Sequence, residues 1–466
     1  MSLDLYKYCY LIGIGGIGMS AIARYFNEKG KNVYGYDQVK SDLCYNLENE
    51  GITINYSDDY FAIPQPIKNA KNNEVLVIYT AAIKSDHELF SFFLKKKYNI
   101  FKRAEILGII SRQSFTIAVA GTHGKTTTST MLAHILKSSG KDATAILGGI
   151  SSNYNTNLLL SAKEDILIVE ADEYDRSFLH IHPDIAIITS VVSDHLDIYK
   201  DKENLHLAFL QFASQVKAKG MLLVEKSVSL NFITPNHGII LKYSANDVTD
   251  YFAKNIRVQN SKMFFDIVVK DIIQRRNAER NQIDIELLMP GIHNISNAVA
   301  ASTVAHYLGL SLIDIAAGIA SFKGVDRRFD KHIDTNRLVY IDDYAHLPDE
   351  ISVTIDTAKQ LYPLRKLMVV FQPHLFTRTK DFADDFAKSL EAADDLVLLD
   401  IYPAREKPIA GINSQMLLDL CNNTKRQLCS KEDLLSILEK KQIDVLLTIG
   451  AGDISTLVQP IKYMLN

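Results

Sequence analysis

Residues 115–128 read Phe-Thr-Ile-Ala-Val-Ala-Gly-Thr-His-Gly-Lys-Thr-Thr-Thr. An apolar run typical of a strand leads into a glycine-containing turn, and a lysine and three threonines then open a helix. Such a junction presents backbone N–H groups and a positive helix end to phosphates, with Lys125 on the terminal ones and a threonine hydroxyl able to hold Mg²⁺. Val119 stands where the common phosphate-loop pattern has glycine, so this loop is shorter. The stretch predicts a binding loop for ATP or GTP.

The composition is that of a large α/β protein with a weak net charge. A length of 466 residues predicts about three domains. The formal net charge of −4 gives no field that would gather nucleic acid or an anionic membrane. The apolar runs fall short of the ~18–20 residues of a membrane span, and the first residues do not form a signal peptide. Cys9, Cys44, Cys421 and Cys429 form no C-x-x-C pair, which favours a reducing compartment. We expect a cytoplasmic protein.

Strand-like and helical patterns alternate along the chain, which predicts parallel sheets with crossover helices. The predicted strands are 8–14, 32–36, 74–79, 115–119, 165–169, 184–189, 338–341, 366–371, 395–399 and 445–449. The stretch 221–290 alternates in charge and predicts antiparallel strands with surface loops. A change of character at the polar stretch 111–114 marks the first domain boundary, and we place the second near 324–329. The predicted domains are residues 1–113, 114–325 and 326–466.

A second glycine-rich turn, Gly13-Ile14-Gly15-Gly16-Ile17-Gly18, follows the first predicted strand and precedes a helix. Glycines let the backbone approach a diphosphate at a helix N-terminus. Asp37 closes the next strand about 20 residues later, where an acid can bond a ribose hydroxyl. The motif leaves open whether the ligand is NAD, FAD or a UDP-sugar, and glycine can also serve a tight turn alone.

Acidic and imidazole side chains follow two strands of the middle section. Glu170-Ala171-Asp172-Glu173 ends one strand, and Asp194-His195-Leu196-Asp197 follows the next. A carboxylate and an imidazole at the tips of two strands could both reach a divalent ion near the phosphates. Most acidic loop residues are only solvated, but the phosphate loop in the same domain favours a metal role.

Further polar clusters open a helix or follow strands of the last section. Asn294 and Asn297 stand at a helix start, where they either cap the helix or contact a base edge. Arg327-Arg328 is either a surface pair or a source of an arginine for a transferring phosphoryl group. Tyr and Arg together suit a carboxylate, because Arg offers a planar fork of donors. The strand-end clusters of this kind are 342–346 and 371–378.

These motifs occur together and in this order in one family, and the chain resembles the Mur ligases from Gly13 to about Asp453. The strings that carry the resemblance are GIGGIGMS (13–20), AGTHGKTTT (120–128), EADE (170–173), DHLD (194–197), GIHNISN (291–297), GVDRRF (324–329), DDYAHLP (342–348), FQPHLFTRT (371–379), DIYPARE (400–406) and GAGD (450–453). The first and the FQPHLFTRT string are specific to members that add alanine. Two departures are Leu347, where the family often has a second histidine, and Val192, where an acid is usual.

The resemblance implies three domains: a Rossmann-like UDP-binding domain, a P-loop-type ATPase domain and a C-terminal Rossmann-like domain that admits the amino acid. The implied reaction is ATP-dependent ligation of L-alanine to the carboxylate of UDP-N-acetylmuramate through an acyl phosphate, with Mg²⁺ (or Mn²⁺) as cofactor. The implied partners are these three substrates, with no nucleic acid and no membrane insertion. A redox enzyme and a switch ATPase each explain one loop only, and a ligase of recycled tripeptide would have Phe at Tyr344.

The resemblance also implies site residues, each carried over by its motif. The catalytic ones are Lys125, Glu170, His195 and Arg328, and the metal ligands are Thr126, Glu170 and His195. ATP would be bound by Gly121, Thr122, His123, Gly124, Lys125, Thr126, Thr127, His293, Asn294, Asn297, Arg328 and Asp343. The UDP substrate would lie against Gly13, Gly15, Gly16, Ile17, Gly18, Met19, Ser20 and Asp37. Alanine and the muramate carboxylate would face Tyr344, His346, His374 and Arg378.

Overall fold

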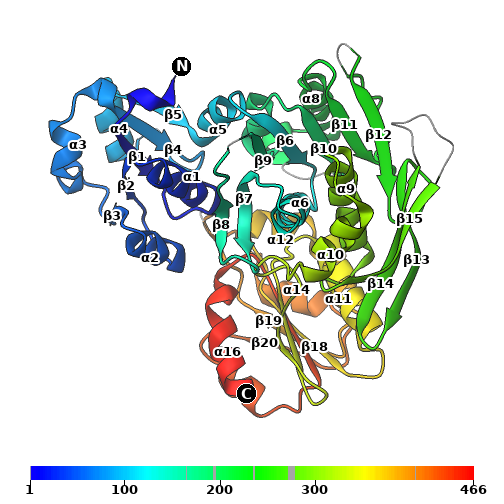
Figure 1. Cartoon of the computed structure of the whole chain (residues 1–466). Helices are drawn as coiled ribbons and strands as arrows, with labels where there is room; N and C mark the ends of the chain where they lie inside the picture. The colour runs from blue at the N-terminus through cyan, green and yellow to red at the C-terminus, as the bar shows by residue number, and fades with distance from the viewer. Residues whose placement is uncertain are drawn as a thin grey trace. The chain divides into compact units, whose positions relative to one another are not determined.

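The structure is a computed structural model that describes residues 2–84, 86–163, 165–192, 196–234, 237–270, 279–404 and 406–466. Three β-sheets follow one another along the chain, each flanked by helices (Figure 1). Most strand pairs are parallel and helices connect them, so the predicted α/β class with parallel sheets is confirmed. None of the helices in the described ranges is long and apolar enough to cross a membrane.

The first sheet has five strands in the order β3-β2-β1-β4-β5, and its strand pairs are parallel. Its strands are β1 Tyr8–Ile12, β2 Asn32–Tyr36, β3 Thr53–Asn55, β4 Val75–Tyr79 and β5 Asn99–Lys102. Its helices are α1 Ile17–Glu28, α2 Asp42–Asn49, α3 Gln65–Asn69, α4 Glu88–Lys95 and α5 Arg103–Ser111. The chain leaves β1 toward β2 on one side and returns as β4 on the other. The glycine-rich turn after β1 therefore lies at the point where strand order reverses, the usual place for a ligand.

The second sheet has ten strands in the order β15-β14-β13-β12-β11-β10-β6-β9-β7-β8. They are β6 Phe115–Ala120, β7 Thr144–Ser151, β8 Thr156–Leu159, β9 Ile166–Glu170, β10 Ile185–Ile188, β11 Met221–Glu225, β12 Ile239–Ser244, β13 Tyr251–Gln259, β14 Lys262–Lys270 and β15 Glu279–Leu287. The helices are α6 Lys125–Ser138, α7 Leu196–Tyr199, α8 Lys202–Ser214, α9 Ile292–Tyr307 and α10 Leu312–Ser321. Strand β6 lies between β10 and β9, so three strand ends meet around the loop that starts α6.

The prediction of antiparallel strands over 221–290 is wrong for the first half of that stretch. Strands β11 and β12 pair in parallel, and so do β12 and β13. Charge alternation reports that one face of a strand is solvated, but it carries no information on the direction of the partner. Asn260 and Ser261, both at positive φ, join β13 to β14 in a two-residue turn, the geometry of an antiparallel hairpin.

The third sheet has six strands in the order β16-β17-β21-β18-β19-β20, with β16 antiparallel to β17. They are β16 Asp330–Asp334, β17 Val339–Asp343, β18 Leu367–Phe371, β19 Asp395–Leu399, β20 Arg426–Cys429 and β21 Val445–Ile449. The helices are α11 Pro348–Leu361, α12 Phe376–Asp381, α13 Ala383–Leu390, α14 Ser414–Leu420, α15 Leu434–Glu439 and α16 Val458–Leu465. Two separate apolar clusters contain the buried residues of this sheet, as expected for a sheet covered on both faces.

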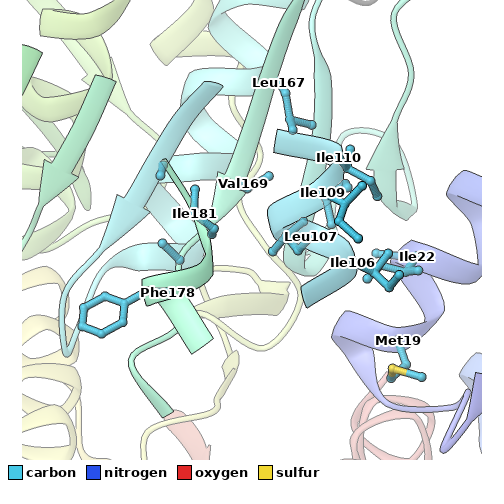
Figure 2. Close-up of a cluster of buried hydrophobic side chains, with 14 of the residues drawn as sticks. Met19, Ile22, Ile106, Leu107, Ile109, Ile110, Leu167, Val169, Phe178 and Ile181 are labelled. Atoms are coloured by element: carbon cyan, nitrogen blue, oxygen red, sulfur yellow. The ribbon is translucent and has the colours of Figure 1, made fainter. Parts of the chain in front are cut away.

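The chain divides into two compact units. One comprises Met1–Lys254, Asp266–Ile285 and His293–Lys323, and the other comprises Asn255–Phe265, Glu286–Ile292 and Gly324–Asn466. In the first unit, one continuous apolar core contains residues of both sheets. Figure 2 shows Ile106 and Ile110 of α5 between Met19 and Ile22 of α1 and Leu167 of β9. The first two sheets are thus packed together through α5.

Candidate active site

The phosphate loop connects β6 to α6 through two glycines in the left-handed region. Gly121 has φ +133° and Gly124 has φ +81°, conformations that other residues rarely adopt. A Cβ atom on Gly124 would lie 2.5 Å from Oδ1 of Asn297, and one on Gly121 would collide with the hydroxyl of Thr189. Because side chains at both positions would meet neighbours, the sequence at this turn is restricted to glycine on two independent grounds.

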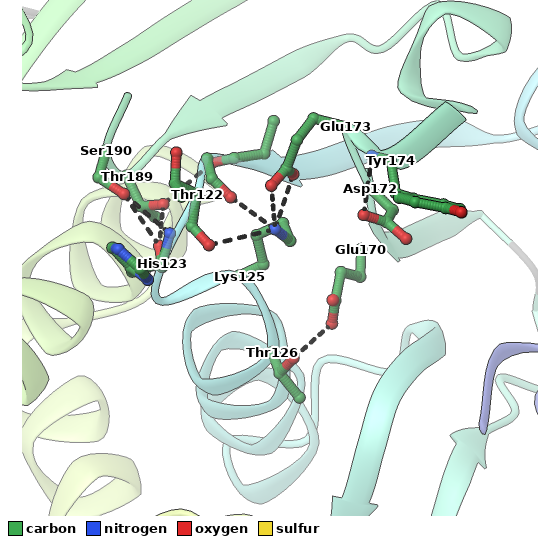
Figure 3. Close-up of polar contacts among 12 residues, drawn as sticks. Thr122, His123, Lys125, Thr126, Glu170, Asp172, Glu173, Tyr174, Thr189 and Ser190 are labelled. Atoms are coloured by element: carbon green, nitrogen blue, oxygen red, sulfur yellow. Dashed lines mark hydrogen bonds and ion pairs between the residues drawn. The ribbon is translucent and has the colours of Figure 1, made fainter. Parts of the chain in front are cut away.

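Residues after β10 hold this loop from one side (Figure 3). The backbone N–H of His123 donates to the Ser190 hydroxyl at 2.9 Å, and that of Thr122 donates to the Ser190 carbonyl at 3.1 Å. The hydroxyl of Thr189 donates to the carbonyl oxygens of Ala120 and His123. Thr189 and Ser190 were not predicted as site residues, because only the parallel pairing of β6 with β10 brings them to the loop.

Lys125 stands at the first position of α6, and its ammonium group faces Glu173. Its Nζ lies 2.7 Å from Oε2 and 2.9 Å from Oε1 of Glu173, and it donates to the Gly121 carbonyl at 2.7 Å (Figure 3). Burial works against the charged ammonium, but the carboxylates of Glu173 and its neighbours outweigh it and raise the pKa of Lys125. Lys125 therefore carries its charge at any physiological pH.

Thr126 and Glu170 join the start of α6 to the end of β9. The Thr126 hydroxyl donates to Oε2 of Glu170 at 2.8 Å. A hydroxyl and a carboxylate offer the hard oxygen atoms that Mg²⁺ prefers, and Mg²⁺ commonly keeps several waters as its other ligands. The two residues therefore fit a magnesium ion, although within the described ranges no group of three or more His, Cys, Asp or Glu residues could hold a metal by itself. His195, the third predicted ligand, lies outside the described residues.

Asn297 of helix α9 lies against the phosphate loop and the first turn of α6. Asn297 accepts a hydrogen bond from the Thr128 hydroxyl at 3.1 Å, and its amide donates to Asn294 at 3.2 Å. Both asparagines are buried, as is Thr127, whereas His293 is exposed. The structure thus brings Asn297 to the loop itself, where it contacts protein groups.

The glycine-rich turn of the first sheet is braced by Asp37. Its carboxylate accepts from the N–H of Gly15 at 2.8 Å and from the N–H of Val39 at 3.0 Å. Ser20 is buried, and its hydroxyl donates to the Ile17 carbonyl at 2.9 Å. The Met19 side chain is packed in the core, so only its backbone can face a ligand. Gly13, Gly15, Gly16 and Gly18 all lie in or beside this turn.

Two basic residues at the start of α5 connect the glycine-rich turn with the acidic loop after β9. A Cβ atom on Gly18 would collide with the guanidinium of Arg103. The same guanidinium lies 3.7 Å from Asp172, and Lys102 lies 3.1 Å from Asp175. Arg103 was not predicted as a site residue, because no motif surrounds it. The one signal in the sequence is Gly18, and a glycine does not indicate which residue lies beside it.

In the second unit, Asp343 at the end of β17 fixes the backbone around Arg328. Its carboxylate accepts from the N–H groups of Phe329 and Ala345, both at 2.7 Å. Burial raises the pKa of Asp343 to about 6, against the opposing effect of Arg328. The guanidinium of Arg328 lies 5.1 Å from the centre of the Tyr344 ring, a cation–π arrangement that leaves its donors available.

The four residues predicted to face alanine and the muramate carboxylate lie close together in the second unit. The rings of Tyr344 and His346 are 5.4 Å apart, and those of His346 and His374 are 6.2 Å apart. Arg378 lies 3.1 Å from Nδ1 of His374. Burial lowers the pKa of His346, opposed by Glu350, so this imidazole is neutral at neutral pH. Aromatic and cationic groups that converge in this way suit a small carboxylate.

Known families match the chain in three consecutive parts. Residues 9–115 match the Mur ligase family, catalytic domain; residues 119–305 match the Mur ligase middle domain; and residues 327–452 match the Mur ligase, glutamate ligase domain. The UDP-N-acetylmuramate–L-alanine ligase of Flavobacterium psychrophilum is 47% identical over 466 residues, with 100% of each chain covered. That of Porphyromonas gingivalis is 46% identical, with 99% of each chain covered.

Solved structures share the fold over nearly the whole chain. The crystal structure of UDP-N-acetylmuramate-alanine ligase MurC from Thermotoga maritima is similar with a TM-score of 0.80 and 26% identity, over 98% of this chain and 99% of that chain. A murein peptide ligase from Psychrobacter arcticus gives a TM-score of 0.70 at 23% identity, over 98% of both chains. At that identity the likeness concerns the fold alone.

Proposed function

The chain belongs to the Mur ligase family, and from this premise we propose that it is an ATP-dependent ligase that joins L-alanine to UDP-N-acetylmuramate in peptidoglycan precursor synthesis. The observation that carries this assignment is the full-length identity of 44–47% to relatives that bear this activity in their names. The phosphate loop with Lys125, Thr126 and Glu170 supports it independently, because it supplies the charges that phosphoryl transfer from ATP requires.

The proposed reaction has two steps. The lactyl carboxylate of UDP-N-acetylmuramate attacks the γ-phosphorus of ATP, which forms an acyl phosphate and releases ADP. The amine of L-alanine then attacks the acyl carbon, loses a proton and expels inorganic phosphate as the amide bond forms. A free carboxylate is a poor acyl donor because its leaving group would be oxide, and phosphorylation replaces that group with phosphate.

The protein contributes position and charge to the first step. The negative charge of the transferring phosphoryl group spreads over its oxygens, and preorganised cations stabilise it. Lys125 at the phosphate loop is the first such cation, and we propose Arg328 of the third domain as a second. Mg²⁺ held by Thr126, Glu170 and His195 would supply further positive charge to the phosphates. Asp343, His293 and Asn294 are proposed to contact the nucleotide.

Each of the three predicted domains has a proposed substrate. Residues 1–113 would bind UDP-N-acetylmuramate through the glycine-rich turn, residues 114–325 would bind ATP, and residues 326–466 would admit L-alanine beside Tyr344, His346, His374 and Arg378. The support for the first assignment is a G-x-G-x-x-G turn at a reversal of strand order, in a family whose curated members act on a UDP-linked sugar. ATP and UDP-linked sugars are cytoplasmic metabolites, so we place the reaction in the cytoplasm.

Phosphate release from ATP in the presence of Mg²⁺ tests the proposal. The assay is run with UDP-N-acetylmuramate and L-alanine together, with each omitted in turn, and with a murein tripeptide in place of alanine. Release that requires both UDP-N-acetylmuramate and L-alanine is expected. Release driven by the tripeptide would assign the chain to the recycling branch of the family, and release that needs neither acceptor would contradict a ligase.

A further inference from the structure

The ammonium group of Lys125 is fully engaged by the protein itself. A lysine has three N–H donors. Nζ has acceptors at 2.7 Å and 2.9 Å on Glu173 and at 2.7 Å on the carbonyl of Gly121. A phosphate oxygen can therefore bind Lys125 only if it replaces one of these acceptors.

Glu173 is the acceptor best placed to be replaced, because it is a charged group that phosphate can match. Its side chain is 1% exposed, and the Tyr199 hydroxyl fixes its backbone by donating to its carbonyl at 2.6 Å. The carbonyl of Gly121, in contrast, belongs to the loop backbone. The carboxylate is thus held beside Lys125 by the ion pair and by the anchored backbone of Glu173, and its burial shields it from water.

We propose that Glu173 is a positioning residue: it holds Lys125 by an ion pair in the nucleotide-free phosphate loop, and the terminal phosphates of ATP replace it as the partner of Lys125. This inference rests on the proposed function, since it assumes that ATP binds at this loop. Nothing in the ligation chemistry requires Glu173 to touch a substrate. Glu173 affects the nucleotide affinity of the loop, because the ion pair between Lys125 and Glu173 must break before Lys125 can bind phosphate.

The charge of Glu173 decides the strength of this competition. The charged groups that face its carboxylate are Lys125 of α6 and Asp172 of its own loop, and the Tyr199 hydroxyl binds its backbone carbonyl. Arg176 lies instead over the Tyr199 ring, and Asp175 pairs with Lys102. Burial raises the pKa of Glu173 to about 7, opposed by Lys125. Below that pH a protonated Glu173 releases Lys125 more readily. Above it the carboxylate both retains Lys125 and repels the phosphates.

Calorimetric titration with a non-hydrolysable ATP analogue and Mg²⁺ tests the proposal on the full chain. Glu173→Gln keeps the size and one acceptor but removes the charge, so we expect binding about tenfold tighter than in the wild type. The matched control is Asp175→Asn, which removes a charge from the same loop but one that pairs with Lys102. Asparagine tolerates the left-handed φ of +52° at this position, and we expect affinity within about twofold of the wild type.

The pH dependence separates competition from a merely structural role. The ratio of wild-type to Glu173→Gln dissociation constants should grow as the pH rises through about 7, because only the wild type carries the titrating carboxylate. Ionisation of the nucleotide contributes equally to both proteins and cancels in the ratio. An affinity of Glu173→Gln that is equal to or weaker than the wild type, or a ratio independent of pH, would overturn the inference.

A second variant keeps the test decisive if Glu173→Gln does not fold, as judged by circular dichroism. Glu173→Asp retains the charge but withdraws it from Lys125 by one methylene group, and it should bind the analogue more tightly than the wild type by a smaller factor. Failure of the wild type itself to bind the analogue would contradict the proposed function. Binding by the wild type without the expected shift would contradict only the role of Glu173.

Discussion

The hydroxyl of Thr126 lies 2.8 Å from Oε2 of Glu170, so the first turn of α6 and the end of β9 meet at one pair of oxygen atoms. The carboxylate of Glu170 also packs against Gly148 of β7, where a Cβ atom would collide with it. Helix α6 and strands β9 and β7 therefore fix this oxygen pair beside the phosphate loop. The hydroxyl of Thr126 and the carboxylate of Glu170 would together hold Mg²⁺ here, which would supply positive charge to the phosphates.

Thr126→Val should raise the Mg²⁺ concentration needed for half-maximal turnover. Valine has nearly the same shape but no hydroxyl, so an ion would lose one oxygen ligand. Turnover is measured across a Mg²⁺ titration at saturating ATP. The control is Thr130→Val one turn along α6, which removes only a hydroxyl that donates to the Thr126 carbonyl at 2.7 Å. Equal Mg²⁺ requirements in the two variants would argue against a metal at Thr126.

Gly124→Ala should abolish nucleotide binding, whereas Gly140→Ala should not. Both glycines have similar positive φ, +81° and +76°, so alanine pays a similar backbone cost of about 1 kcal/mol at each. Only at Gly124 would the Cβ atom meet a neighbour, Oδ1 of Asn297 at 2.5 Å, whereas nothing lies within 4 Å at Gly140. ATP-analogue affinity and melting temperature distinguish the two. Similar losses in both variants would mean that backbone strain, not the Asn297 contact, limits the loop.

Lys125→Ala should lower turnover by about 10²–10³-fold, the loss expected when one preorganised group at a developing charge is removed. The control is Lys137→Ala near the other end of α6, an exposed lysine whose ammonium lies over the Tyr154 ring. Steady-state rates at saturating substrates give both values. Near-normal turnover of Lys125→Ala would show that this loop does not hold the transferring phosphoryl group.

The pH dependence of stability should change when Asp343 is replaced by Asn. Burial raises the pKa of Asp343 from 3.8 to about 6, so the folded state binds this proton more tightly than the unfolded chain. The stability that this group contributes is therefore present below about pH 4 and is lost as the pH rises through about 6. Asp343→Asn cannot titrate, so its stability deficit relative to the wild type should shrink over this interval. Urea midpoints followed by circular dichroism measure the deficit, and a deficit that stays constant with pH would contradict the shift.

Tyr344→Ala should lower turnover by about threefold to thirtyfold. The Tyr344 ring positions Arg328, and its cation–π interaction with the guanidinium contributes about 0.5–2 kcal/mol to holding Arg328 in place. Tyr344→Phe keeps the ring and should stay close to the wild type if the ring is what matters. The Michaelis constants for ATP and for L-alanine, measured for both variants, show which substrate feels the change. A large effect of Tyr344→Phe would instead assign the function to the hydroxyl.

The buried parallel strands were the part of the fold that sequence could predict best. Asn32–Tyr36, Asp395–Leu399 and Val445–Ile449 have the predicted bounds, because each is a short run of strand-forming residues bounded by polar ones. The pairing direction in 221–290 was missed because exposure of a strand face does not depend on its partner's direction. Short strands at sheet edges, such as β3 and β20, carry too few apolar residues to stand out.

The sequence predicted those residues of the candidate site that belong to its motifs, but not the residues that only the packing of the chain brings to them. Lys125, Thr126 and Glu170 are brought together as predicted, but the partner of Lys125, Glu173, could not be deduced from spacing. Arg103 lies in no motif, and its place beside Gly18 depends on how α5 packs. Of the two departures from the family pattern, Val192 donates its N–H to Thr122, and Leu347 is nearly buried at the start of α11.

Transfer of an oxygen-18 label from the lactyl carboxylate of UDP-N-acetylmuramate to phosphate would show whether the reaction passes through an acyl phosphate. Both oxygens of that carboxylate carry the label. Its attack on ATP makes one of them the bridge between carbon and phosphorus in the acyl phosphate, and that bridging oxygen leaves with phosphate when L-alanine attacks. The proposed mechanism predicts one labelled oxygen in each phosphate released and one retained in the amide product, both measured by mass spectrometry. Label-free phosphate formed together with UDP-N-acetylmuramoyl-L-alanine would contradict it.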